Sequence, residues 1–162
     1  MFDKIQKTIM HGLRGTHIHM DPLKALDGLN ADTAKLVPMN GKFSCWQILY
    51  HIVYWQDLML THLREEKASW PKNNEASWPD NDSLGGEDAW LDLVSRFKKG
   101  IEEAEVLTKN IDSFDNLPTP PEVPAYAALS VFTQHNAYHI GQLVATRQAL
   151  GAWPPPNYKP TY

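Results

Sequence analysis

Two histidines in the last quarter of the chain have the spacing at which one ion could join them. His135 and His139 lie four residues apart in the segment HNAYHIGQ. Residues four apart in a helix share one face, about one turn apart, so both imidazoles could reach a single metal ion. The same spacing fits two core histidines that hydrogen-bond to the backbone or to neighbouring side chains. The pair alone leaves both interpretations open.

A third histidine, His51, lies in another strongly apolar segment, on the border between its buried and its solvated face. Burying three imidazoles is costly unless each finds a partner, and one divalent cation would satisfy three ring nitrogens together. The third histidine therefore favours the metal interpretation. Imidazole ligands suit several transition metals, of which we expect zinc or nickel, with iron as a further candidate.

The sequence lacks the residues that other metal and thiol sites of helical proteins require. The di-iron motif needs a Glu three residues before each histidine, but Ile48, Phe132 and Asn136 occupy those positions. The zincin motif lacks its glutamate, and Cys45 is the only cysteine, which excludes an internal disulfide, cysteine-rich zinc sites and covalent haem. Cys45 begins a helix, where the helix dipole could activate its thiol; a small buried filler is the favoured alternative.

Four segments with helical periodicity must position these side chains, and no segment reads as a strand. The first helix begins near Phe2, stops near Gly15 and is continued by a second piece from Asp21-Pro22 to Gly28, so we expect it to be broken. The second helix begins at Ser44, and the third covers residues 87–109. The fourth runs from Pro124 to Leu150, with Gly151 as its cap. The pattern predicts an all-α four-helix bundle.

The helix that carries His51 has a well-defined start. Ser44 followed by Gln47 three residues later forms a capping box, in which each side chain bonds the other residue's backbone N–H. Its polar arc is predicted to follow alternating steps of three and four residues: Gln47, Tyr50, Tyr54, Asp57, Thr61 and Arg64.

Residues 65–86, EEKASWPKNNEASWPDNDSLGG, lose helical periodicity and contain two Trp-Pro pairs. Proline favours an extended backbone in the residue before it, so this segment is predicted to be a long loop between the second and third helices. Loops of this length are often lids or binding loops. A packed surface excursion explains the segment equally well.

Composition narrows the class of protein further. A chain of 162 residues fits one domain over residues 1–162, and its formal charge of −4 with scattered basic residues argues against nucleic-acid binding. No apolar run is long enough to cross a membrane, and the first residues do not resemble a signal peptide. We therefore expect a cytoplasmic protein that acts without nucleic acid or membrane.

Two segments together resemble the DinB-like superfamily, which includes the YfiT-type proteins: SCWQILYHIVYWQ with one histidine, and FTQHNAYHIGQLVATRQALGAW with the histidine pair followed by Gly-Gln. The resemblance covers nearly the whole chain. It implies a four-helix bundle in which His51, His135 and His139 bind a divalent metal. Relatives include transferases and isomerases that use low-molecular-weight thiols, and members described only as metal-dependent hydrolases. The HGLRGTHIHMDP segment and the Trp-Pro loop depart from the commonest pattern.

The resulting hypothesis is a metal-dependent enzyme that activates water or a low-molecular-weight thiol for attack on a small-molecule substrate. Its pocket is predicted to be walled by Trp55, Tyr138 and the Trp-Pro loop. No catalytic acid or base can be assigned. Gln142, three residues after His139, could orient a ligand or simply pack between helices. Histidines outside the predicted site are His11, His17, His19 and His62.

A different class of function also fits the sequence. In this alternative the histidines only stabilise the core, and the protein is a non-catalytic helical module that forms a homodimer or binds a partner. The apolar Trp153-Pro154-Pro155-Pro156 segment would suit such docking.

Overall fold

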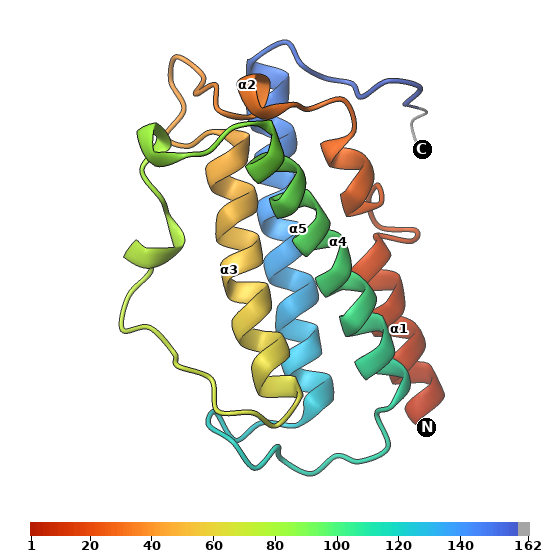
Figure 1. Ribbon diagram of the computed structural model, residues 1–162. Helices are drawn as coiled ribbons and strands as arrows, with labels where there is room; N and C mark the ends of the chain where they lie inside the picture. The colour runs from red at the N-terminus through yellow and green to blue at the C-terminus, as the bar shows by residue number, and fades with distance from the viewer. Residues whose placement is uncertain (159–162) are drawn as a thin grey trace.

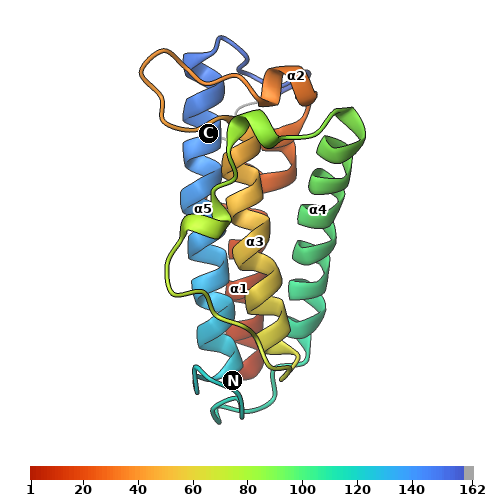
Figure 2. The ribbon, with the colours of Figure 1, turned by 60° about the vertical axis from the view of Figure 1, so that its left-hand side comes forward.

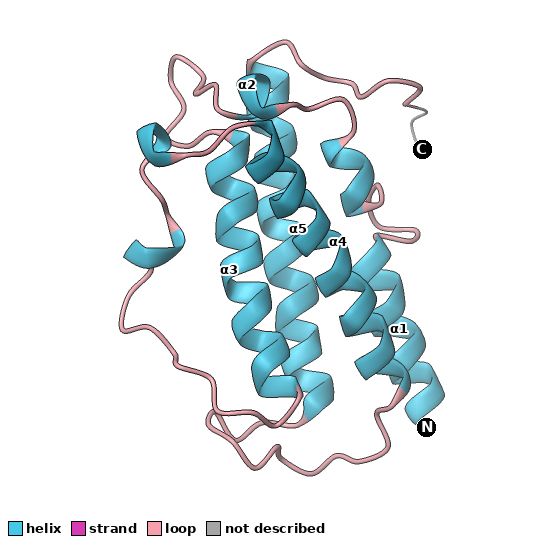
Figure 3. Ribbon diagram, viewed as in Figure 1, coloured by secondary structure: helices cyan, strands magenta, loops and turns pink. Residues whose placement is uncertain are grey.

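The chain forms an elongated bundle of helices, shown as a computed structural model that describes residues 1–158 (Figures 1 and 3). No strand occurs over those residues, which confirms the predicted all-α fold. Within the described residues there are five α-helices and three short 3-10 helices. The α-helices are α1 Phe2–Arg14, α2 Ala31–Ala34, α3 Cys45–Leu63, α4 Glu87–Lys109 and α5 Ala125–Ala149, and the 3-10 helices are Pro22–Leu26, Glu75–Ser77 and Asn81–Ser83.

The four long helices pack around a common axis, with α3 against both α4 and α5, and α1 against the same two helices. Helices α1 and α5 run in one direction and α3 and α4 in the other (Figures 1 and 2). Because α3 and α4 are parallel neighbours, their connection must return along the bundle, a distance of about 28 Å for a helix of 19 residues. This topology requires the long loop of residues 65–86.

The first helix is broken, as predicted. Helix α1 ends at Arg14, and its capping residue Gly15 adopts a left-handed conformation with φ 68°, which glycine accommodates readily. The second piece is a 3-10 helix that begins after Asp21, whose carboxylate accepts a hydrogen bond from the Leu23 N–H. Gly28, with φ 78°, lies just past its end.

The predicted start of α3 is confirmed, but one assignment on its polar arc is wrong. Ser44 and Gln47 form the capping box, with each side chain bonded to the other's backbone N–H. Gln47 is buried rather than solvated, because the loop of residues 65–86 folds over it and the carbonyl of Pro79 accepts a hydrogen bond from its amide.

Two clusters of buried apolar side chains fill the bundle, one toward each end. Along α5, side chains up to Phe132 belong to one cluster and those from Ile140 onward to the other. His135 and His139 lie between the two clusters, at the face that α5 turns toward α3. None of the described helices has the length and apolarity that crossing a membrane requires.

Candidate metal centre

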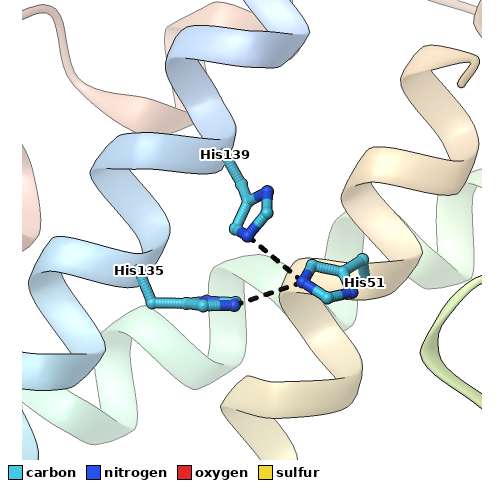
Figure 4. Close-up of side chains that lie close together, drawn as sticks. All are labelled: His51, His135 and His139. Carbon is cyan, nitrogen blue, oxygen red and sulfur yellow. Dashed lines mark hydrogen bonds between the residues drawn. The ribbon is translucent and has the colours of Figure 1, made fainter. Parts of the chain in front are cut away.

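His51 from α3 and His135 and His139 from α5 converge where the two helices pack (Figure 4). One ring nitrogen of each lies within 4.8 Å of the others. The Nε2 atom of His51 is 3.1 Å from Nε2 of His139 and 3.3 Å from Nε2 of His135. His51 and His139 are buried and His135 is half-buried. This buried cluster could hold a metal ion.

The hydrogen bonds of His51 determine which of its nitrogens is free. Its Nδ1 lies 2.8 Å from the hydroxyl oxygen of Ser77. That hydroxyl donates its own proton to the backbone carbonyl of Asn74, at 2.6 Å, so its oxygen accepts a hydrogen bond from the His51 ring. The proton of the neutral ring therefore sits on Nδ1, and Nε2 presents a lone pair to the cluster.

His139 is oriented in the same way by a different side chain. Its Nδ1 donates to the amide oxygen of Gln142 at 2.7 Å, and the amide nitrogen of Gln142 donates to the Tyr138 hydroxyl at 3.3 Å. The Nε2 atom of His139 is therefore also unprotonated and carries a lone pair. This hydrogen bond fits the orienting role, one of the two that the sequence left open for Gln142.

Two unprotonated nitrogens 3.1 Å apart cannot hydrogen-bond to each other, because neither has a proton to donate, whereas a cation between them could bind both lone pairs. Outer hydrogen bonds to the Nδ1–H of histidines are also how proteins fix metal ligands. The residues present thus fit a shared cation.

Burial keeps the three imidazoles neutral. It lowers the pKa of His51 to about 3, with smaller contributions from the neighbouring His139 and His135. It likewise lowers the pKa of His135 to about 4, with His139 contributing, and lowers the pKa of His139. Neutral rings are the form that binds a metal, so near pH 7 the cluster needs no deprotonation to do so.

An aromatic stack holds the His51 ring from the side of the loop. Trp78 lies parallel to His51, with centroids 4.0 Å apart and an interplanar angle of 14°, and its other face stacks on Phe43 at 3.9 Å. Ser77 and Trp78 therefore position the His51 ring. The sequence predicted that the Trp-Pro loop walls the pocket, but it singled out neither residue as a partner of His51.

A cavity of about 580 Å³ extends from the cluster along α3 and α5. Trp55 and the loop residues Trp70 and Trp78 line it, as predicted, so part of the loop borders the candidate site. Tyr138 does not; its side chain is 64% exposed and lies outside the cavity, because it is on the outer side of α5. The lining residues include no charged side chain: His51, Trp55, Met59, His62, Trp70, Asn74, Trp78, Pro121, Val123, Ala127, Ala128, Val131, His135 and His139.

Cys45 and the four other histidines lie outside the three-histidine cluster, and one of these histidines lines the cavity. Cys45 is fully buried, and burial raises the pKa of its thiol to about 12, which supports the filler interpretation over a reactive thiol. His11, His17 and His19 lie outside the three-histidine cluster. His62, which the sequence gave no reason to include, lines the same cavity as the cluster.

A helical bundle with a buried three-histidine cluster between its helices defines a class of candidate metal-binding bundle proteins. The family model of the DinB superfamily matches residues 18–143, which include all three histidines, and the chain belongs to this superfamily. No curated protein and no solved structure matches the chain.

Proposed function

We propose that the protein is a metal-dependent enzyme in which His51, His135 and His139 hold one divalent cation, with zinc or nickel expected. It acts on a small-molecule substrate with water or a low-molecular-weight thiol as the nucleophile. The observation that carries the proposal is the pair of outer hydrogen bonds, from His51 to Ser77 and from His139 to Gln142, which leave both Nε2 lone pairs facing one point.

When bound, a divalent ion at three imidazoles supplies Lewis acidity that favours the ionised form of a water or thiol nucleophile. The protein contributes orientation and an apolar cavity wall. Ser77 and Gln142 hold the two imidazoles in the required tautomer, and the indole rings of Trp55, Trp70 and Trp78 line the cavity beside the cluster.

No carboxylate lines the cavity, so its wall offers no Asp or Glu as a general base. The titratable side chains among the lining residues are four histidines, and three of them form the cluster. This composition supports a reaction whose nucleophile is activated at the cluster, and it does not favour a carboxylate-based mechanism.

Metal analysis of protein purified without added metal tests the ligand assignment. We expect wild type to contain close to one equivalent, and His135→Ala to lose most of it, because a three-ligand site becomes a two-ligand site. His11→Gln is the matched control, since His11 lies on α1 outside the cluster. Equal metal contents in all three proteins would rule out the assignment.

Activity assays test the enzymatic part separately. Metal-loaded and chelator-treated protein would be compared in thiol transfer from a panel of low-molecular-weight thiols to uncharged electrophiles, and in esterase and amidase screens. We expect metal-dependent turnover in at least one assay. Inactivity of fully metal-loaded protein, together with a dimer on size-exclusion chromatography, would favour the non-catalytic module.

A further inference from the structure

The cavity beside the histidine cluster has the size of a small-molecule pocket. Its volume of about 580 Å³ lies within the range of roughly 300–1,000 Å³ that is usual for pockets that bind small molecules. The three histidines of the cluster line it, and most of the other lining residues belong to α3, α5 and the loop of residues 65–86. A molecule bound in this cavity would therefore lie beside the candidate metal centre.

Outside the cluster, the cavity offers a ligand few polar groups. His62 lines it, but its Nδ1 lies 2.9 Å from the hydroxyl of Thr119 and its Nε2 is itself buried, so neither nitrogen is an available partner for a ligand. The indole N–H of Trp70 is bonded to the carbonyl of Pro120. Asn74 is a solvent-exposed residue of the loop. The cluster is therefore the main polar part of the cavity wall.

The cavity wall also lacks charge. Among the described residues, none that lines the cavity is an Asp, Glu, Lys or Arg. Burial lowers the pKa of His62, as it does for the histidines of the cluster, so all four rings are neutral near pH 7. An ionised group in this cavity would lose its hydration without gaining an opposite charge.

We propose that the cavity binds an uncharged, mainly apolar molecule, with its polar, reactive group at the histidine cluster. Burying the apolar body against side chains such as Trp55, Met59 and Trp70 removes apolar surface from water, which favours binding. A charged molecule is selected against, because no side chain of the wall compensates for its lost hydration. The proposal names a substrate class for the site and rests on the proposed function for the reaction, but not for binding.

The test compares two fluorescent probes that share one ring system. Phenylnaphthylamine is uncharged, and anilinonaphthalene sulfonate is the same molecule with one sulfonate added. Binding to chelator-treated wild-type protein at neutral pH is followed by the rise in probe fluorescence. We expect the uncharged probe to bind about tenfold or more tightly, because the sulfonate loses hydration without a partner. Equal affinities, or tighter binding of the sulfonate, would overturn the proposal.

A variant that fills the cavity shows where the probe binds. Ala127 of α5 is half-buried and lines the cavity, so the indole of Ala127→Trp should occupy part of its volume, and the uncharged probe should lose most of its affinity. Ala145→Trp is the matched control, at an exposed position of the same helix that does not line the cavity, and should bind the probe like wild type. Unchanged binding in Ala127→Trp would overturn the assignment to this cavity.

A charge placed at the cavity tests the reason for the selectivity. Val131 lines the cavity and is 57% exposed, so Val131→Arg can be accommodated without burying the guanidinium. It should improve binding of the sulfonate relative to the uncharged probe by about two- to fivefold. Val106→Arg is the matched control, 56% exposed on α4 and outside the cavity, and should leave the ratio unchanged. An unchanged ratio in Val131→Arg, or an equal change in both variants, would overturn the proposal.

The proposed function and the proposed substrate class fail independently. Probe binding is measured without metal, so a protein that holds no metal and shows no turnover but selects the uncharged probe would contradict only the proposed function. A protein with full metal occupancy and turnover that binds the sulfonate as tightly as the uncharged probe would contradict only the substrate class.

Discussion

Side chains that never touch the cluster's centre decide what its histidines can do. Gln142 accepts the Nδ1 proton of His139, and Ser77 accepts that of His51. Each bond fixes a tautomer and a ring orientation, which a metal ligand needs and a merely packed histidine does not. These outer contacts lead to a prediction about affinity that leaves the three histidines in place.

Replacing Gln142 by leucine should weaken metal binding by roughly 10- to 100-fold, because the Nδ1–H of His139 loses its acceptor and the ring its fixed orientation. Competition with a chromophoric chelator measures this affinity. The matched control is Gln148→Leu, an exposed amide on the same helix. If both variants bind metal like wild type, the amide plays no part in orienting the ligand.

The packing of α3 against α4 depends on one close approach. Gly100 of α4 faces Gln56 of α3, and a Cβ added at Gly100 would lie 1.8 Å from the amide nitrogen of Gln56. Gln56 is fully buried, and its amide donates to the carbonyls of Arg96 and Phe97, so the side chain has little freedom to move aside. The parallel helix pair therefore requires glycine at this position.

Gly100→Ala should reduce the free energy of unfolding by about 1–3 kcal/mol through overpacking. Urea denaturation measures the change. Gly141→Ala is the control, since a Cβ there meets nothing within 4 Å; it should leave stability unchanged or raise it by up to about 1 kcal/mol. Combining Gly100→Ala with Gln56→Ala should recover part of the loss, and simple additivity of the two would argue against the clash.

The loop of residues 65–86 connects the parallel helices α3 and α4 and also contacts the candidate site. It is long because α3 and α4 run in parallel, and on its way back it places Ser77 and Trp78 against His51 and Trp70 against the cavity. Residues of the loop line the cavity and contact His51, which fits a binding loop better than a packed surface excursion.

The stability of the whole molecule should depend on pH through its buried histidines. In the unfolded chain a histidine has a pKa of about 6.5, whereas burial lowers the pKa of His51 to about 3 and of His135 to about 4. Between these values the unfolded chain binds protons that the folded chain does not, so the free energy of unfolding falls as the pH falls from about 7 toward 4.

Urea denaturation of metal-free protein at about pH 7 and about pH 5 measures this loss. A variant with His51→Gln and His135→Gln should lose less stability over the same range, because two of the groups responsible are gone. An equal loss in the variant and in wild type would place the acid sensitivity elsewhere in the molecule.

Local patterns in the sequence determined the four long helices and the candidate members of the cluster. The limits Glu87–Lys109 of α4, the Ser44–Gln47 capping box and the break after Gly15 were all predictable, because periodicity and caps act over a few neighbouring residues. The spacing of His135 and His139 placed them on one helix face for the same reason.

Only the tertiary structure decided what surrounds the histidines. The packing of the bundle decided several features: the contacts of Ser77 and Trp78, the burial of Gln47, the exposure of Tyr138 and the place of His62 in the cavity. Two of these residues lie in a loop without periodicity, and the others on helix faces whose neighbours come from distant parts of the chain. Local sequence specifies a helix and its faces, but which segment covers a given face is settled only when the bundle packs.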